Sequence, residues 1–449
     1  MGQGILTPGF HRVSAAATDR AAGTSASPGA AAGTLYCESV PLDRIADDVG
    51  TPCYVYSAGT VRERYTQLDA MLAGVPHRIH YTLKANSNAG LLRVLREAGA
   101  GVDVVSGGEL ARALRAGFPA RDVIFGGVGK TDEELADALR AGVLLVNVES
   151  ESEVRALDRI AGQMGKGTRA PVSIRVNPEI TVEAAHAYIK TGERGHKFGV
   201  PFDEVLHVAR IAAALPNVDL LGLDMHLGSQ LSRIDPYREG ATRLAGLHAT
   251  LVREGIDTLR YLDVGGGLGV RYDSEEPPDL ARFAALVLPI VRETGLQLIM
   301  EPGRFVVGNA AALVTRVLYR KRSGGKTYLV CDAGMTELLR PSHYGAFHRV
   351  VPVVSDGTAG ESIVADVVGP VCESGDFLAL DRAIEAVDPG DLLAVCDVGA
   401  YGYAMASNYN SRLRPPEVLV DGTAYAVVTR RETLNDLVQR EVNEPDWRH

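Results

Sequence analysis

The feature that most constrains the fold of this chain is a regular alternation of short apolar runs and longer amphipathic stretches between residues 79 and 301. The runs are rich in β-branched residues, which is typical of buried strands, and the stretches between them repeat apolar residues at helical spacing. One stretch opens with Thr131-Asp132-Glu133-Glu134, a pattern typical of a capped helix start. Eight runs predict strands, at residues 79–84, 102–105, 123–125, 144–148, 172–176, 220–226, 261–264 and 298–301.

Eight consecutive βα units indicate a (β/α)8 barrel of the TIM type. An open doubly wound sheet is the alternative, and it would carry a phosphate-binding glycine turn after its first strand. The glycine cluster of this chain, Gly265-Gly266-Gly267, follows the seventh predicted strand instead. Phosphate sites after the seventh and eighth strands are common in barrels, so the barrel is the preferred prediction.

The sequence pattern changes after about residue 310. Apolar and polar residues now alternate as in strands, and turns such as Ser323-Gly324-Gly325 separate the apolar runs. This pattern predicts a second, all-β domain, a small barrel or sandwich. The segment before the first barrel strand has no place in the eightfold count, so we expect it to join the β domain. The expected divisions are a disordered tail at 1–33, an N-terminal segment at 34–75 that leads into the barrel, the barrel at 76–310, and the C-terminal β domain at 311–449.

Charge and cysteine content narrow the classes of function. The formal net charge of -10 argues against a general nucleic-acid partner, and no apolar run approaches the roughly 20 residues of a membrane span. The five cysteines are an odd number without CxxC spacing, which is typical of reduced thiols. These features predict a cytoplasmic protein with no nucleic-acid or membrane partner.

The carboxyl ends of the predicted strands should meet at one mouth of the barrel, so polar residues at those ends form a candidate site. Lys84 is one of them. A lysine at a strand end is most often solvated or salt-bridged, but Schiff-base formation with a carbonyl cofactor is the functional alternative. The other candidates at the mouth are Asn86, Asp103, Ser106, Asn147, Glu149, Arg175, Asn177, His226, Ser229, Gly265 to Gly267, and Glu301 to Arg304.

Each of these residues alone also has a structural explanation: a loop for the glycines, a core position for His226, and an ion pair with Arg304 for Glu301. A metal site is not indicated, because His226 lacks a second histidine at ligand spacing. Together, however, a lysine, a histidine, a glycine turn and a carboxylate suit pyridoxal phosphate. The glycines would approach its phosphate, the histidine one ring face, and the carboxylate its pyridine nitrogen. An acidic partner keeps that nitrogen protonated, which favours reactions such as decarboxylation.

At this point the sequence resembles the diaminopimelate decarboxylases, a family of the alanine-racemase-like (fold type III) pyridoxal-phosphate enzymes. The resemblance runs in order from about residue 35 to 442, and no single motif is as specific as the set. Its motifs are Tyr81-x-x-Lys84-Ala85-Asn86, His226-x-Gly228-Ser229-Gln230, Gly265-Gly266-Gly267, Glu301-Pro302-Gly303-Arg304, Leu339-Arg340-Pro341-Ser342-His343-Tyr344, Cys372-Glu373-Ser374-Gly375-Asp376 and Gly399-Ala400-Tyr401-Gly402.

The resemblance implies a role for each motif. Lys84 would be the Schiff-base lysine, His226 the ring-stacking histidine, and Cys372 the proton donor, contributed from the partner subunit. Residues implied to bind the cofactor are Lys84, Asp103, His226, Ser229, Gly265, Gly266, Gly267, Glu301, Gly303, Arg304 and Tyr401. Residues implied to bind the substrate are Arg304, Arg340, Tyr344, Glu373 and Tyr401. The resemblance also implies a homodimer with active sites at the interface, and a lid at residues 185–199.

The expected reaction is decarboxylation of meso-2,6-diaminopimelate, a small amino-acid substrate, to L-lysine and CO2, the last step of lysine biosynthesis. Three alternatives stay open at this stage. The first is a decarboxylase of the same class that acts on another amino acid, such as ornithine, arginine or a secondary-metabolite precursor. The second is a racemase, which usually has a less electron-withdrawing pyridine partner than Glu301. The third is a catalytically silent regulator, which would be expected to lack the lysine or the cysteine.

Overall fold

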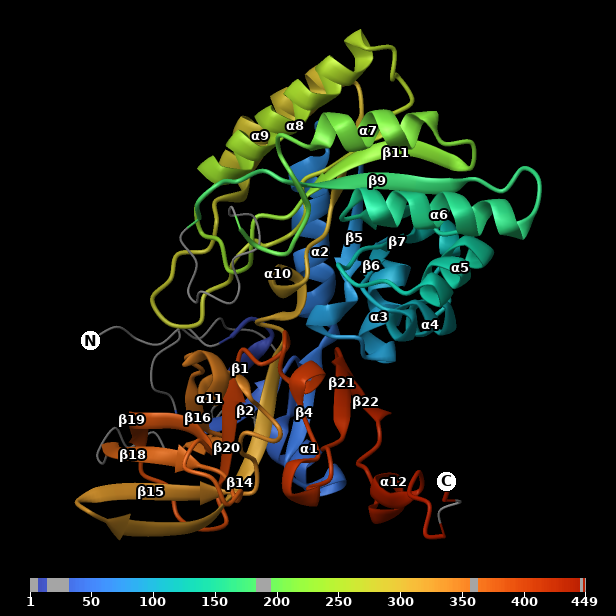
Figure 1. Cartoon of the computed structure of the whole chain (residues 1–449). Coiled ribbons are helices and arrows are strands. Elements are labelled where there is room, and N and C mark those ends of the chain that lie inside the picture. The colour runs from blue at the N-terminus through green and yellow to red at the C-terminus, as the bar shows by residue number, and fades with distance from the viewer. Residues whose placement is uncertain (1–6, 14–31, 183–194, 356–361, 445–446, 449) are drawn as a thin grey trace. The chain divides into compact units, whose positions relative to one another are not determined.

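The computed structural model describes residues 7–13, 32–182, 195–355, 362–444 and 447–448 (Figure 1). The chain divides into two compact units, one formed by Met1–Thr60 with Asn309–His449 and the other by Val61–Gly308. The sequence analysis placed the end of the N-terminal segment at residue 75, whereas the compact units separate at Thr60. The expected lid at 185–199 falls largely on residues 183–194, which lie outside the described residues.

The unit Val61–Gly308 is a closed barrel of parallel strands. Eight strands follow one another around it, in the order β9, β11, β12, β13, β5, β6, β7 and β8, and a direct β8–β9 pairing closes the ring; the short β10 pairs with β9. The (β/α)8 prediction is therefore confirmed. The strands are β5 His77–Thr82, β6 Gly101–Val104, β7 Val123–Phe125, β8 Leu145–Val148, β9 Ala170–Asn177, β10 Val200–Pro201, β11 Val218–Met225, β12 Tyr261–Asp263 and β13 Gln297–Met300.

Helix α2 Ala58–Leu72 precedes the first barrel strand, and the short α10 Arg304–Val307 follows the last. The helices between them connect the strands and lie around their outer side (Figure 1); they are α3 Ala89–Glu97, α4 Gly107–Arg115, α5 Asp132–Ala141, α6 Glu151–Met164, α7 Val205–Ala214, α8 Asp235–Arg253 and α9 Leu280–Thr294. Thr131 and Glu134 form the capping box expected at the start of α5. Ser106 and Ser150 cap α4 and α6 in the same way, by accepting backbone N–H groups of the first turn. These caps fix where each strand-end loop gives way to its helix.

The eight predicted strands all exist, and one boundary matters for function. The first strand was expected to continue to Lys84, but β5 ends at Thr82 and Lys84 lies in a 3-10 turn, Leu83–Ala85. Inside the barrel the strands are packed with buried apolar residues, including Ile124, Leu145 and Ile299. The mouth is therefore supported by a solid core.

The second unit is built from β sheets, as expected, and it includes the N-terminal segment. Strand β4 (Cys53–Ser57) pairs antiparallel with β14 and parallel with β21, so residues before the barrel complete the sheet. Its C-terminal strands are β14 Ala311–Ser323, β15 Lys326–Cys331, β16 Val350–Pro352, β17 Val354–Ser355, β18 Ser362–Val368, β19 Phe377–Glu385, β20 Leu392–Cys396, β21 Glu417–Asp421 and β22 Ala424–Thr429. This unit also contains β2 Gly33–Cys37, β3 Val40–Pro41 and the helices α1 Leu42–Val49, α11 Arg340–Tyr344 and α12 Leu434–Val438.

The expectation of a disordered tail over residues 1–33 is wrong for Phe10–Val13. These residues form β1, which pairs antiparallel with β2. Phe10 is buried in the core of this unit together with Leu35 and Cys37, and burial of its ring explains why this short piece is ordered. The sequence did not indicate this strand, because Phe10 is a single aromatic residue in a stretch rich in Ala, Gly and Ser and shows no periodic apolar pattern.

Candidate active site

Lys84 lies at the barrel mouth beside a buried carboxylate. Its Nζ is 3.9 Å from Oδ2 of Asp103, and the lysine side chain is 39% exposed whereas that of Asp103 is 3% exposed. Thr82 connects this pair to the eighth strand, since its hydroxyl lies 2.9 Å from Oδ2 of Asp103 and 3.1 Å from the carbonyl oxygen of Glu301. The amine is therefore accessible at the mouth, and its counter-charge is fixed in the wall.

The glycine turn after β12 packs too closely for any side chain. A Cβ on Gly266 would lie 2.0 Å from the carbonyl oxygen of Glu301, and a Cβ on Gly265 would lie 2.3 Å from that of Met225. Gly265 and Gly267 also have positive φ angles of 69° and 96°. The turn is held from below by Tyr237, whose hydroxyl donates to the carbonyl oxygen of Gly266 at 2.8 Å.

His226 follows β11 and contacts this turn through its ring. The backbone N–H of Gly266 donates to Nδ1 of His226 at 3.3 Å, so Nδ1 acts as the acceptor. Burial lowers the pKa of His226 well below its usual value, and the nearby cations Lys84 and Arg175 lower the pKa further. The ring is consequently a neutral imidazole, which suits packing against another ring better than proton transfer.

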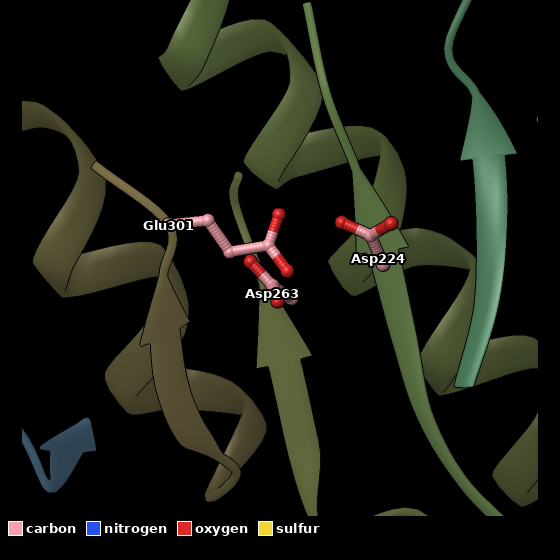
Figure 2. A group of neighbouring side chains, drawn as sticks. All are labelled: Asp224, Asp263 and Glu301. Atoms are coloured by element: carbon pink, nitrogen blue, oxygen red, sulfur yellow. The ribbon is translucent and has the colours of Figure 1, made fainter. Parts of the chain in front are cut away.

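Three buried carboxylates gather below the mouth, on neighbouring strands (Figure 2). Asp224 on β11 and Asp263 on β12 are register partners, and Glu301 follows the next strand, β13. One carboxylate oxygen from each residue lies within 4.8 Å of those of the other two. Figure 2 shows the Glu301 side chain reaching across toward Asp263. Burial raises the pKa of all three carboxyl groups, and each is raised further by other carboxylates of the site.

Asp263 links the carboxylate group to the glycine turn. Its Oδ1 accepts the backbone N–H of Gly265 at 2.8 Å, and its side chain hydrogen-bonds with that of Glu301. Two carboxyl groups can share a hydrogen bond only if a proton lies between them. Burial raises the pKa of Asp263 to about 7, which is consistent with a proton on this pair.

Arg175 supplies positive charge to the same row of the barrel. It is the register partner of Asp224 on β9, and its Nε lies 4.0 Å from Oδ2 of Asp224. Its Nη1 donates to Oε1 of Glu149 at 2.8 Å. Burial acts to lower the pKa of Arg175, but Glu149, Asp224 and Glu301 raise it above its usual value. One permanent cation therefore offsets part of the negative charge of the carboxylates.

Arg304 crosses the mouth from the loop after β13 and is held by two hydroxyl groups. Its Nη1 donates to the hydroxyl of Tyr272 at 2.7 Å, and its Nε and Nη2 lie 3.3 and 3.2 Å from the Ser229 hydroxyl. Gly303, just before it, packs against Ala85, and a Cβ there would lie 3.0 Å from the Ala85 Cβ. The Lys84 turn and the Arg304 loop are therefore in contact.

The other predicted site residues belong to the sheet unit. Arg340 is the buried first residue of α11, which ends at Tyr344, and its Nη1 lies 2.9 Å from Nε2 of His348. Tyr401 has a positive φ of 58°, a backbone conformation that is uncommon for a residue with a side chain. The Cys372 thiol is exposed, and the Glu373 side chain hydrogen-bonds with Tyr409, an interaction that raises the Tyr409 pKa.

The barrel residues fit pyridoxal phosphate. They provide an accessible amine at Lys84, a neutral buried imidazole, a turn in which a Cβ would clash, and a buried carboxyl group at Glu301. Among the residues that the structure describes, no donor lies within hydrogen-bond range of the buried atoms Asp263 Oδ2 and Asp224 Oδ1, as expected where a proton or a bound group completes the site.

Comparison with known proteins agrees with this set of residues. Residues 58–308 match the family model for the pyridoxal-binding domain of pyridoxal-dependent decarboxylases. The chain is 45% identical over 406 residues to diaminopimelate decarboxylase of Vibrio cholerae, an alignment that covers 90% of this chain and 96% of the relative. This chain belongs to the diaminopimelate decarboxylase family. The family's enzyme from Aquifex aeolicus is 43% identical over 412 residues, which covers 91% of this chain and 95% of that relative.

Solved structures of the same family have the same fold. The diaminopimelate decarboxylase of Helicobacter pylori, crystallised with L-lysine, superposes with a TM-score of 0.85 at 38% identity, and covers 89% of this chain and 99% of that chain. The diaminopimelate decarboxylase of M. jannaschii, also in complex with L-lysine, gives a TM-score of 0.86 at 31% identity and covers 92% of this chain and 96% of that chain. None of the helices in the described part of our chain combines the length and hydropathy of a membrane span.

Of the predicted site residues, the barrel unit contains Lys84, Asp103, His226, Ser229, Gly265 to Gly267, Glu301, Gly303 and Arg304. The sheet unit contains Arg340, Tyr344, Cys372, Glu373 and Tyr401. The roles of these residues remain predictions. Sequence reasoning missed Asp224, Asp263 and Tyr272 as site residues. The first two precede His226 and Gly265 by two positions, and residues two apart on a strand share a face, so this spacing could have revealed them. The partnership of Tyr272 with Arg304 had no sequence signal.

Proposed function

We propose that this chain is a pyridoxal-phosphate-dependent carboxy-lyase that converts meso-2,6-diaminopimelate to L-lysine and CO2. The observation that carries the proposal is membership of the diaminopimelate decarboxylase family over 90% of the chain, together with the motifs from Lys84 to Tyr401 read in its sequence. Relatives of this family have been crystallised with L-lysine, the product that the proposal assigns to this chain. A cytoplasmic location, as expected for a biosynthetic step, belongs to the same proposal.

The bound cofactor supplies an electron sink for the pair of electrons left on carbon when the carboxylate departs as CO2. Lys84 is assigned as its covalent anchor. Asp103, 3.9 Å from Nζ and buried in the wall, keeps the amine directed at the mouth. Glu301 is assigned as the partner of the pyridine nitrogen, because an acidic group at that position keeps the nitrogen protonated. Asn147 supports Glu301, since its Nδ2 lies 3.4 Å from Oε1.

Protonation within the carboxylate group favours this assignment. The hydrogen bond with Glu301 lowers the Asp263 pKa, whereas burial and the neighbouring carboxylates raise the Glu301 pKa well above its usual value, so the proton of this pair is assigned to Glu301, where it would be available to the pyridine nitrogen. Arg175 offsets the charge that remains on Asp224. Asp263 also holds the Gly265 N–H, so one side chain sets both the glycine turn and the orientation of Glu301.

The phosphate is assigned to the glycine turn, Ser229, Gly303, Arg304 and Tyr401. Two N–H groups of the turn are already used within the chain, that of Gly265 by Asp263 and that of Gly266 by His226. The phosphate contact of the turn is therefore placed at Gly267. His226, neutral and fixed by Gly266, is assigned to one face of the cofactor ring.

The substrate is held through its charged groups. Arg304, Arg340, Tyr344 and Tyr401 are assigned to its carboxylates, and Glu373 to its distal ammonium, because paired charges of this kind read both groups of an amino-acid end. The C–C bond to the departing carboxylate breaks, and the electron pair stays on carbon until a proton arrives. Cys372 is assigned as the donor of that proton; its thiolate then recovers a proton from solvent. We propose a homodimer in which the partner subunit contributes this cysteine.

The test of this assignment is a substrate panel. Purified holoenzyme would be offered meso-diaminopimelate, its LL and DD stereoisomers, lysine, ornithine and arginine, and CO2 release would be measured for each. The proposal expects the highest kcat/KM with the meso isomer. A higher kcat/KM with ornithine or arginine would indicate a same-class decarboxylase of different specificity. Interconversion of enantiomers without CO2 would indicate a racemase.

A further inference from the structure

Arg340 and His348 form a buried pair in the sheet unit. Nη1 of Arg340 lies 2.9 Å from Nε2 of His348, and Nδ1 of the same imidazole lies 2.9 Å from the carbonyl oxygen of Cys396. His348 is 0% exposed and Arg340 is 6% exposed. A carbonyl oxygen can only accept and a guanidinium can only donate, so Nδ1 carries hydrogen and Nε2 accepts. The two contacts together define His348 as a neutral imidazole in one tautomer.

The backbone around His348 is held on both sides. The chain after it enters β16, which pairs with β20 in the register Val350 with Val395, and the Cys396 N–H donates to the carbonyl oxygen of Arg349 at 2.8 Å. On β19, Arg382 donates from Nη1 to the carbonyl oxygen of His348 at 3.3 Å. The position of the imidazole is thus set by the sheet itself.

The Arg382 guanidinium also lies 3.8 Å from the centroid of the Phe347 ring, which fixes the residue before His348. Arg340, by contrast, is the first residue of α11, a helix of only five residues that ends at Tyr344 and is capped by Gly345 in the left-handed conformation. A long, flexible arginine at the start of a short helix needs a partner to hold its planar guanidinium in one direction. The sheet supplies that partner through His348.

We propose that His348 is a positioning residue, which aims the Arg340 guanidinium at a carboxylate of the substrate. This inference rests on the substrate-binding role proposed above for Arg340. A neutral acceptor suits the task, because it fixes the direction of the guanidinium without cancelling its charge. An aspartate or glutamate in the same place would compete with the substrate carboxylate for that charge.

The experiment compares three substitutions in full-length holoenzyme. H348F keeps a flat ring but has no acceptor, H348Q offers a neutral acceptor, and H348E offers an anionic one. H11F is the matched control, since His11 is an exposed histidine on β1 of the same unit. The measurements are KM and kcat for meso-diaminopimelate, the Kd of L-lysine by calorimetry, the visible absorbance of the bound cofactor, and the thermal midpoint.

The proposal expects H348F to raise KM and the lysine Kd about 10-fold, the effect of one hydrogen bond to a charged group, with kcat within about twofold and unchanged cofactor absorbance. H348Q should stay within about threefold of wild type, and H348E should be at least as weak as H348F. If H348F does not fold, the comparison of H348Q with H348E decides, with H348Q expected to bind more tightly.

Three results would overturn the inference: a folded H348F with the KM and lysine Kd of wild type, an H348Q as weak as H348F, or equal affinities for H348Q and H348E. If the wild-type enzyme decarboxylates meso-diaminopimelate, any of these three results overturns only the role of His348 and leaves the proposed function intact. Failure of wild-type holoenzyme to release CO2 from that substrate would instead contradict the proposed function and, with it, the premise for His348.

Discussion

The backbone N–H of Gly266 donates a hydrogen bond to Nδ1 of His226 at 3.3 Å. This contact joins the glycine turn after the seventh barrel strand to the histidine after the sixth. Since burial and two cations also lower the His226 pKa, the ring is a neutral, oriented plane at the barrel mouth. The account assigns it to packing against the cofactor ring, and this role can be separated from proton transfer.

Replacing His226 by phenylalanine retains a flat ring, whereas alanine removes it. We expect H226A to weaken pyridoxal-phosphate binding about 10-fold, the effect of losing one ring-stacking contact, and H226F to remain within about threefold of wild type. The measurement is the Kd of the cofactor for apoprotein, followed by fluorescence quenching. Equal weakening in H226F and H226A would show that the imidazole nitrogens, not the ring plane, are required.

Gly266 has no room for a methyl group, because a Cβ there would lie 2.0 Å from the Glu301 carbonyl oxygen. G266A should therefore displace the backbone that bears Glu301, lower the free energy of unfolding by about 1–3 kcal/mol and weaken cofactor binding. G246A is the matched control: Gly246 lies within α8, and a Cβ there would meet no atom of the described residues within 4 Å. It should stabilise the protein by about 0.5–1 kcal/mol. Unfolding in urea measures both, and an unaffected G266A would contradict the close packing.

The pair Asp263 and Glu301 predicts how stability depends on pH. Burial raises the Asp263 pKa to about 7 in the folded protein, whereas an unfolded aspartate titrates near about 4. Between these values the native state binds more protons, so the free energy of unfolding falls as the pH rises from about 4 to about 7, and above that it no longer changes through this group. The loss is up to about 4 kcal/mol for this one group.

Asp263→Asn isolates that contribution, because the amide can accept from Gly265 and donate to Glu301 as a protonated aspartate does. Urea unfolding of the apoprotein at pH 5 and pH 8 should show wild type losing more stability over this interval than D263N. Parallel stability curves for the two proteins would contradict a shared proton at this position.

The spacing of Asp224, Asp263 and Glu301 also permits a divalent cation by ligand type alone. In this site the charge of the carboxylates is instead offset by a bound proton and by Arg175, whose Nε lies 4.0 Å from Oδ2 of Asp224. Exhaustive dialysis against EDTA should therefore leave the thermal midpoint and the activity of the holoenzyme unchanged. A loss of either, restored by adding Mg²⁺ or Mn²⁺, would show that a metal occupies the carboxylate group.

Sequence reasoning predicted the barrel well because hydrophobic periodicity records burial directly. All eight strands, the glycine turn and the join of β4 to the second unit could be anticipated in this way. Sequence reasoning failed for features that depend on tertiary packing and not on a local sequence pattern. Phe10 is ordered by a pocket built from residues far along the chain, and Lys84 lies in a turn beyond its strand. Asp224 and Asp263 are acidic residues inside apolar strands; their spacing from His226 and Gly265 could indicate that they face the site, but their direct pairing comes from the register between β11 and β12.

The central claim is that this chain decarboxylates meso-diaminopimelate through a site anchored at Lys84. The most direct measurement is the release of CO2 and L-lysine from that substrate by purified holoenzyme, with K84A beside it and K166A, an exposed lysine, as control. The account predicts CO2 and L-lysine in a one-to-one ratio for wild type and K166A, and a loss of about 10³-fold or more in kcat for K84A. No CO2 from wild type loaded with pyridoxal phosphate, or full activity in K84A, would contradict it.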